Sequence, residues 1–360
     1  FDYISPEELL RRTANTFDAL GQMERFRGHF YNWYDTQTLS KLHPHYISSV
    51  DSGNLCGYLL TLRRGLLDLP GRKIAADRLM EGIADTLGVL GDIVEKTKIN
   101  QLAEFRKFLD FSADERSRSA SELWRRLDTL AVKARDLALV LEDNPEHPAF
   151  AWGRSLAHQC RNAADELALL CPWVTLEIPS DKVAQILAEI GIPTLQEVAD
   201  LPVGRSGLFA ELTGPDAGGE ERSWAEVFFR LAAQGSLQAR QRLSVIFCLA
   251  KKAGELAEMD YSFLYDKGRK LLTIGYSVGE RRRDASFYDL LASEARFCSF
   301  VAIAQGHLPK ENWFALGRML GNPEGEPVLL AWDGSMFEYL MPLLIMPNFE
   351  NTLLDQTYKA

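Results

Sequence analysis

The sequence has few of the residues that build disulfide frameworks or metal centres. Its 360 residues include five cysteines and six histidines. The cysteines are scattered through apolar surroundings and form no CxxC pair, so we expect neither disulfide bonds nor structural zinc. One local histidine pair, His43 and His45, flanks Pro44, which predicts a loop and not a metal site. We therefore expect no bound metal and no cofactor.

Long hydrophobic runs and an excess of positive charge are also missing. The longest apolar run, at residues 340–346, is far too short to span a bilayer, and no signal peptide opens the sequence. The formal net charge of −10 argues against a nucleic-acid partner and suits a neutral sugar substrate. With 46% hydrophobic and 25% charged residues, the composition is that of a soluble globular protein. We expect no direct membrane contact from this segment.

Helical periodicity fills most of the sequence and suggests three regions. Residues 1–67 are expected to form the first part of a helical body. Residues 68–257 read as nearly continuous helices, an insertion or subdomain. Residues 258–360 begin with two alternating apolar runs around Asp266-Lys267-Gly268, which predict a β-hairpin. Composition and period alone predict a mostly α protein.

A glutamate among apolar residues marks residues 284–303, DASFYDLLASEARFCSFVAI. Large apolar residues recur there at three- and four-residue spacing, which predicts one amphipathic helix with Glu294 on its apolar face. Burial raises the pKa of a carboxyl, and a carboxyl protonated near neutral pH serves as a general acid. The alternative is a structural ion pair between Glu294 and a nearby arginine such as Arg296 or Arg318.

A second glutamate, Glu338, lies between large apolar residues in residues 332–344, WDGSMFEYLMPLL. The turn at residues 333–335 predicts a helix N-cap, so Glu338 is expected about one turn into a buried helix. Paired carboxylates carry out glycoside hydrolysis and transglycosylation. Many aromatic residues surround both glutamates in the sequence. Most are expected in the core, but several could supply the flat faces on which sugars stack.

Residues 24–66, ERFRGHFYNWYDTQTLSKLHPHYISSVDSGNLCGYLLTLRRGL, form a third block. Together the three blocks resemble the glucoamylase-like middle region of bacterial cyclic β-1,2-glucan synthases. The clear match covers about residues 20–67 and 258–358, and the stretch between them matches loosely. The resemblance implies an (α/α)6-barrel-type glycoside hydrolase fold, incomplete at both ends, with a helical insertion and a short β-hairpin.

The resemblance implies retaining transglycosylation that cyclises linear β-1,2-glucan. It makes Glu294 the general acid/base and places the nucleophile in a further family block past Ala360. Glu338 is the alternative second carboxylate or, as we expect, a group that orients the substrate. Two other functions stay open: a β-1,2-glucan hydrolase, and a non-catalytic module that binds glucan or scaffolds neighbouring domains.

Aromatic and small polar residues in these blocks are candidates for binding β-1,2-glucan. Asp and Asn side chains can donate to or accept from sugar hydroxyls, and aromatic rings can stack on a glucose ring. A helix cap is the alternative for Asp51, and core packing is the alternative for Trp33. The candidate residues are Trp33, Tyr34, Asp35, Asp51, Asn54, Tyr288 and Trp332.

The resemblance also implies partners and a location. The partners are the glycosyltransferase region and the phosphorylase-like region of the same parent chain. The location is the cytoplasmic face of the bacterial inner membrane, as part of a larger membrane-anchored enzyme.

Overall fold

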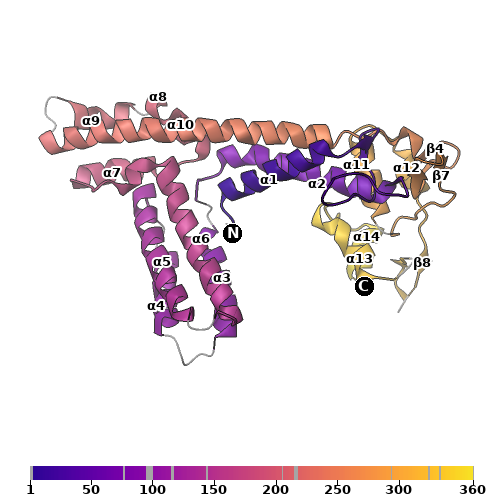
Figure 1. The fold of residues 1–360 in the computed structure, drawn as a ribbon, viewed down its shortest axis with the longest axis horizontal. Helices are drawn as coiled ribbons and strands as arrows, with labels where there is room; N and C mark the ends of the chain where they lie inside the picture. The colour runs from indigo at the N-terminus through magenta and orange to yellow at the C-terminus, as the bar shows by residue number, and fades with distance from the viewer. Residues whose placement is uncertain are drawn as a thin grey trace. The chain divides into compact units, whose positions relative to one another are not determined.

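A computed structural model describes residues 3–75, 78–94, 100–114, 117–142, 145–204, 206–214, 218–292, 294–322, 325–331 and 334–359. The described chain is mostly helical with a few short strands, as period and composition predicted (Figure 1). It divides into two compact units: unit 1 comprises residues 1–13 and 67–247, and unit 2 comprises residues 14–66 and 248–360. Within the described ranges no helix combines the length and apolar character needed to cross a membrane.

Unit 1 is a set of helices whose leucine-rich faces pack on one another. Helix α6 packs against α5 and α3, and α4 packs against α5 (Figure 1). Ser119 caps α5 by accepting from the Glu122 backbone N–H at 3.2 Å, which satisfies one of the orphan donors of the first turn. Its elements are η1 (Leu69–Gly71), α3 (Leu79–Ile93), α4 (Asn100–Asp114), α5 (Ala120–Leu141), α6 (Pro148–Leu170), η2 (Pro172–Thr175), α7 (Asp181–Ile190), α8 (Leu195–Gly204), η3 (Ser206–Phe209) and α9 (Ala210–Thr213).

Unit 2 combines shorter helices with strands and loops. The boundary between the units falls within α1 (Pro6–Gln22) and α10 (Gly219–Leu256) and close to the end of α2 (Ser49–Asp68). One hydrophobic cluster of this unit joins Leu290, Leu291, Leu316, Leu329 and Ala331. The remaining helical elements are η4 (Tyr261–Phe263), α11 (Ala295–Ala304), α12 (Glu311–Ala315), α13 (Met336–Leu340), η6 (Met341–Leu344) and α14 (Leu353–Lys359).

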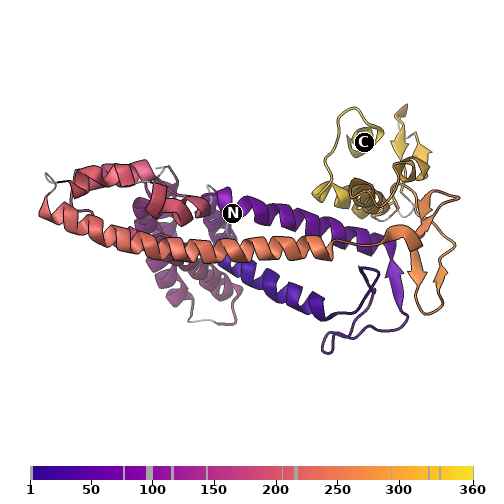
Figure 2. The same cartoon turned by 90° about the horizontal axis from the view of Figure 1, so that it is seen from above.

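The strands of unit 2 form small antiparallel sheets. The hairpin predicted around Asp266 is confirmed, since β4 (Tyr265–Asp266) pairs with β5 (Leu271–Leu272). The second apolar run continues into β6 (Gly275–Ser277), which pairs with β7 (Arg282–Arg283) and with the distant β3 (Tyr46–Ser48), as Figure 2 shows. The other pairs are β1 (Arg25–Phe26) with β2 (His29–Phe30), and β8 (Leu320–Gly321) with β9 (Val328–Leu329).

The helix predicted over residues 284–303 is wrong in its first half. Helix α11 begins at Ala295, and residues 284–292 form turns and extended chain. The Asp289 carboxylate accepts from the backbone N–H groups of Leu291 and Ala292, at 2.9 and 2.7 Å. Such a turn competes with helix formation. The Leu290 N–H donates instead to the Gly317 carbonyl at 2.9 Å, so long-range hydrogen bonds replace those of a helix.

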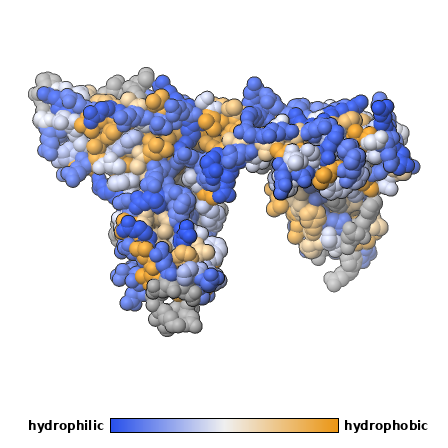
Figure 3. Space-filling model, in the orientation of Figure 1, coloured by the Kyte–Doolittle hydropathy of each residue, from blue (hydrophilic) through white to orange (hydrophobic). Residues whose placement is uncertain are grey.

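The helix predicted around Glu338 is confirmed, with Ser335 at its N-cap and Glu338 buried, but it is shorter and more exposed than expected. Helix α13 has only five residues, and Met336 and Phe337 are 65% and 54% exposed. Figure 3 shows hydrophobic residues over the part of unit 2 where Figure 1 places α13 and α14. Pro342 interrupts a longer α-helix because it removes a backbone donor, and the chain continues as the short 3-10 turn η6. The three regional boundaries expected from the sequence stay a prediction.

Candidate functional site

Two helices of unit 2, α2 and α11, cross closely enough to bring distant candidate residues together. A Cβ atom at Gly53 would lie 2.3 Å from Cys298 Cβ, and one at Gly57 would lie 2.0 Å from Phe297 Cζ. Only glycine allows this approach, because any side chain would overlap the facing helix. The Cys298 thiol donates to the Ser49 carbonyl at 3.0 Å. The first turns of both helices therefore lie next to each other.

Glu294 lies directly before α11 and is buried, with 9% of its surface exposed. Its carbonyl accepts from the backbone N–H of Cys298 at 3.0 Å. The two arginines considered as its structural partners both donate to main-chain carbonyls. Arg296 donates to those of Glu338 and Tyr339, each at 2.7 Å, and Arg318 donates to that of Leu316 at 2.6 Å.

The charges of three carboxylates act on the phenol of Tyr288. Burial raises the pKa of Tyr288, and the negative charges of Asp51, Glu294 and Asp284 raise it further. Asp51 comes from the first turn of α2, Glu294 from the start of α11, and Asp284 from the residue after β7. We refer to Asp51, Asp284 and Glu294 as the carboxylate cluster. Across the described residues no group of three or more His, Cys, Asp and Glu side chains is arranged to hold a metal ion.

Tyr46 and Trp33 adjoin the carboxylate cluster. The Tyr46 hydroxyl donates to the Asp284 carboxylate, and burial together with this bond raises the pKa of Tyr46. The Trp33 and Tyr46 ring centroids are 6.4 Å apart at an angle of 36°, and Trp33 is 46% exposed. Core packing therefore does not account for Trp33. An accessible aromatic face beside several convergent polar groups is typical of a small-molecule binding site.

Asp51 and Asn54 lie on one face of α2, three residues apart. The same face carries Tyr58, whose ring contacts that of Phe297 on α11 with centroids 6.5 Å apart. Ser48, and not Asp51, caps α2, because the Ser48 Oγ accepts from the Asp51 N–H at 3.2 Å. The helix-cap alternative for Asp51 is therefore wrong.

The amide of Asn54 has an unsatisfied acceptor. Its Oδ1 atom is buried and has no hydrogen-bond partner among the residues that the structure describes. The Asp51 carboxylate, one turn earlier, accepts from Asn32 Nδ2 at 3.4 Å and is exposed. A buried acceptor without a donor costs stability unless a water or a ligand satisfies it.

Tyr34 and Asp35 belong to the loop between β2 and β3. The Tyr34 hydroxyl donates to the Glu24 carbonyl at 2.6 Å and accepts from the Tyr31 N–H at 2.9 Å. Asp35 accepts from the backbone N–H groups of Gln37 and Thr38, and hydrogen bonds, chiefly to Thr38, lower the pKa of Asp35. Both side chains are thus already hydrogen-bonded to nearby groups of the chain, and their role in binding stays a prediction. Trp332 lies outside the described residues.

The surroundings of Glu338 have a structural explanation. Glu338 is 4% exposed and is the third residue of α13. Its Oε2 atom accepts from the backbone N–H and the hydroxyl of Ser335, both at 3.3 Å, which forms a capping box. This cap accounts for a buried carboxylate at the start of a short helix. A catalytic or orienting role for Glu338 stays a prediction.

Two residues next to the predicted candidates were missed from the sequence. Tyr46 and Asp284 are 238 positions apart and meet through the pairing of β3 with β6 and of β6 with β7. Tyr46 lies in the block of residues 24–66 and Asp284 in that of residues 284–303, but the candidates predicted in these blocks were other residues. The strand runs are two or three residues long, so no periodic signal marks the pairing.

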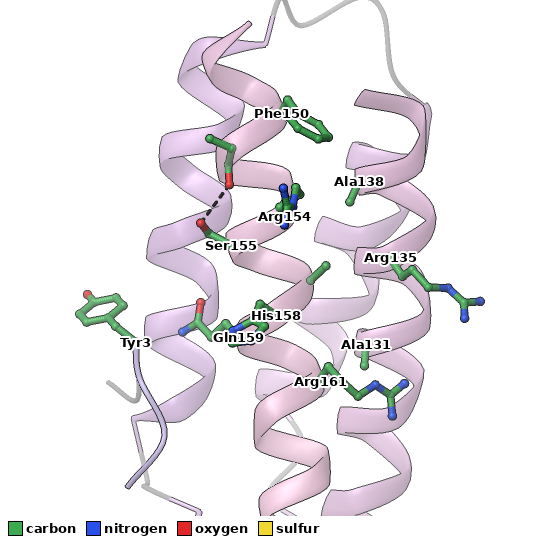
Figure 4. Close-up of a pocket in the computed structure, with 12 residues that line it drawn as sticks. Tyr3, Ala131, Arg135, Ala138, Phe150, Arg154, Ser155, His158, Gln159 and Arg161 are labelled. Atoms are coloured by element: carbon green, nitrogen blue, oxygen red, sulfur yellow. Dashed lines mark hydrogen bonds between the residues drawn. The ribbon is translucent and has the colours of Figure 1, made fainter. Parts of the chain in front are cut away.

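A cavity of about 760 Å³ lies in unit 1, along α5 and α6. Figure 4 shows Phe150, Arg154 and His158 on α6 among its lining residues. Arg161 also lines it and pairs with Asp128 at 3.0 Å. The lining contains no member of the carboxylate cluster, so we do not place the candidate chemistry there.

Comparison with known proteins relates the chain to a glucan synthase. No protein-family model matches the chain. The chain is 32% identical over 364 residues to "Cyclic beta-(1,2)-glucan synthase NdvB" of Rhizobium meliloti (strain 1021). The alignment covers 99% of the chain and 11% of that synthase, so the chain spans a small part of its relative. The resemblance found in the three sequence blocks is confirmed, and the chain corresponds to one region of a cyclic β-(1,2)-glucan synthase.

Proposed function

We propose that this chain forms part of a cyclic β-1,2-glucan synthase and carries a retaining transglycosylation site that closes linear β-1,2-glucan into a ring. The observation that carries the proposal is the position of Glu294. This buried carboxyl opens α11 beside Tyr288 and the other members of the carboxylate cluster. The name of the aligned synthase supports the choice of substrate.

In the proposed reaction Glu294 is the general acid/base. A second carboxylate attacks the anomeric carbon while Glu294 gives its proton to the departing glycosidic oxygen. Glu294 then removes the proton from a hydroxyl at the far end of the same glucan as that oxygen attacks the anomeric carbon. The carboxylate leaves, the configuration is retained, and a ring is formed.

The second carboxylate of this mechanism is proposed to lie in a part of the parent synthase outside these residues. Glu338 is the alternative, although its capping box with Ser335 already explains its burial. If Glu338 orients the substrate, it does so from the first turn of α13, where its carboxylate lies. Retention requires the two carboxyl groups about 5–5.5 Å apart.

Glucan is proposed to bind along the carboxylate cluster. Trp33 would stack on a glucose ring, and Asp51 and Asn54 would bind hydroxyls through an exposed carboxylate and a buried amide acceptor. Tyr288 would line the same site. Tyr34 and Asp35 would contribute through their loop, and Trp332 is proposed as a further aromatic surface.

Residues 1–67 and 258–360 are proposed to belong to an (α/α)6 barrel of the glycoside-hydrolase type, with residues 68–257 as a helical insertion or subdomain. The proposed partners are the glycosyltransferase and phosphorylase-like regions of the parent chain. We place the site at the cytoplasmic face of the inner membrane.

Mass spectrometry of the products tests the proposal. The parent synthase would be incubated with linear β-1,2-glucan as wild type and as Glu294→Gln in this region. Glu280→Gln is the matched control, because Glu280 lies on an exposed turn, paired with Arg282. Rings are one water lighter than linear chains of the same length. We expect rings from the wild type and the control, and at least about a hundredfold less from Glu294→Gln.

Other outcomes would identify the rival functions. Shorter linear products without rings would make the site a β-1,2-glucan hydrolase. Tight glucan binding with no product dependent on Glu294 would make it a non-catalytic module. Full activity of Glu294→Gln would remove Glu294 from the mechanism, and Glu338→Gln would then be the next variant to compare.

A further inference from the structure

One hydrogen bond joins the two halves of unit 2 beside the proposed site. Tyr46 lies on β3 and donates from its hydroxyl to the carboxylate of Asp284. The backbone of Asp284 is held separately, because its N–H donates to the Gly275 carbonyl at 3.0 Å. The position of the main chain therefore does not depend on the tyrosine. The bond fixes the direction of the carboxylate.

The ring of Tyr46 is held in place by the sheet. A Cβ atom at Gly275 would lie 2.0 Å from the Tyr46 hydroxyl and 2.6 Å from the Ile47 carbonyl. The residue facing the phenol must therefore be glycine. A tyrosine clamped in this way has little rotamer freedom left to lose when a ligand binds, which favours affinity.

Two kinds of group that suit a sugar flank this pair. The exposed indole of Trp33 lies against Tyr46, and the charges of Asp284 and Asp51, with the phenol of Tyr288, act on the Tyr46 hydroxyl. Asp284 itself is partly exposed. An ionised carboxylate offers about four acceptor positions, and Tyr46 uses one of them. A hydrogen bond from a sugar hydroxyl to this carboxylate would be charge-assisted and strong.

We propose that Tyr46 is a positioning residue that aims the Asp284 carboxylate at a glucose hydroxyl beside the indole of Trp33. The inference rests on the proposed function and adds a subsite residue and its positioning partner to it. The ligand is a neutral pyranose of the β-1,2-glucan chain. The rival explanation is that the pair only ties β3 to the segment after β7.

Isothermal titration of the 360-residue chain with linear β-1,2-glucan separates the two explanations. Asp284→Asn keeps an oxygen that can accept from Tyr46 but removes the charge. Tyr46→Phe removes the aiming hydroxyl and keeps the ring against Trp33. We expect each variant to bind about tenfold more weakly than the wild type. Thermal unfolding of Asp284→Asn should match the wild type.

A matched control exists in unit 1. Tyr3 donates to the Asp85 carboxylate at 2.7 Å, also across a long stretch of chain, although in more exposed surroundings than the bond of Tyr46. Tyr3→Phe therefore removes the same kind of bond away from the carboxylate cluster, and glucan affinity should not change.

The outcomes separate this inference from the function on which it rests. Wild-type affinity of Asp284→Asn, or equal weakening by Tyr3→Phe, overturns the positioning role and leaves the proposed function standing. Equal losses of affinity and thermal stability in Asp284→Asn would make the pair a structural tie. Absence of glucan binding by the wild-type chain contradicts the proposed glucan site itself, and the inference with it.

Discussion

The contacts inside unit 1 differ in kind from the contacts inside unit 2. In unit 1, helices that follow one another in the sequence pack through many buried leucine and alanine side chains, as α5 does on α6. In unit 2, specific polar bonds join residues more than two hundred positions apart, such as Tyr46 with Asp284 and His29 with the Asp260 carbonyl. When one apolar contact of unit 1 is lost, neighbouring apolar side chains can take its place. A long-range hydrogen bond of unit 2 has one donor and one acceptor, and no other group can take its place. Single substitutions should therefore cost more in unit 2.

The largest expected effect is that of Arg296→Met. Arg296 is 1% exposed and donates to the Glu338 and Tyr339 carbonyls and to the Tyr358 hydroxyl. Losing these donors leaves buried acceptors unsatisfied, and we expect the free energy of unfolding of unit 2 to fall by about 4 kcal/mol. Urea unfolding measured by circular dichroism would report it.

Arg240→Met in unit 1 is the matched control for Arg296→Met. Arg240 is an exposed guanidinium that donates to the Ala199 carbonyl at 3.1 and 3.2 Å. Water can replace its bonds, so the loss should be much smaller. Equal losses for the two variants would contradict the contrast between the units.

Glycines allow a second comparison. Gly57→Ala should destabilise unit 2 by about 3 kcal/mol, because the new methyl group overlaps Phe297 and forces α2 away from α11. Gly88→Ala in α3 should stabilise unit 1 by up to about 1 kcal/mol, since nothing lies within 4 Å of the added Cβ and alanine favours a helix. Thermal unfolding of both variants would measure this difference, and a stable Gly57→Ala protein would show that the helices can separate without cost.

The stability of unit 2 should depend on pH through His29. Burial lowers the pKa of His29 from 6.5 to about 4, and its ring nitrogens lie 2.8 Å from Ser52 Oγ and 3.0 Å from the Asp260 carbonyl oxygen. Between these pKa values the unfolded chain binds more protons, so stability falls as the pH drops from about 6.5 towards 4. The change from pH 7 to 4.5 should be about 2 kcal/mol.

Chemical unfolding at several pH values, with His29→Gln as the comparison, would measure this dependence. The variant is expected to be less stable at pH 7 and to lose less stability on acidification. An equally steep loss in the variant would assign the effect to other groups.

The smallest effects should be the same in both units. Ser119→Ala removes the cap of α5 in unit 1, and Ser48→Ala removes the hydroxyl that receives the Asp51 N–H in unit 2. Each should cost about 1 kcal/mol, because a cap acts within one turn of its own helix. If unfolding curves gave clearly different losses in the free energy of unfolding for the two variants, the contrast between the units would extend to local hydrogen bonds.

The same contrast explains what could be predicted from the sequence. The helices of unit 1 were predicted because their stability depends on periodic apolar faces, which a sequence displays directly. The turn at Asp289 was missed because its apolar neighbours fit a helical period equally well. The bond between the Leu290 N–H and the Gly317 carbonyl, which replaces a helical bond, is not visible in a local pattern.

For the candidate site, the sequence identified residue types but not their arrangement. Asp51, Asn54, Tyr288 and Glu294 were predicted individually, and in the structure the charges of Asp51 and Glu294 both act on Tyr288. Their proximity depends on the approach of α2 to α11 at Gly53, and a single glycine in a helical pattern does not reveal such a crossing. Glu338 shows the opposite case, since its apolar neighbours suggested a buried helix and are mostly exposed.

The order in which unit 2 is synthesised has a consequence for how it is assembled. Its first part ends at residue 66 and its second begins at residue 248, with unit 1 between them in the sequence. In β3 of the first part, Ile47 pairs with Tyr276 of β6. The ribosome therefore releases β3 long before it has synthesised the strand with which β3 pairs. Unit 1, whose contacts are largely local, can fold meanwhile. The face of α2 that packs on α11 therefore has no partner during translation until α11 has been synthesised. Residues 49–68 are thus the segment that a chaperone would most usefully protect.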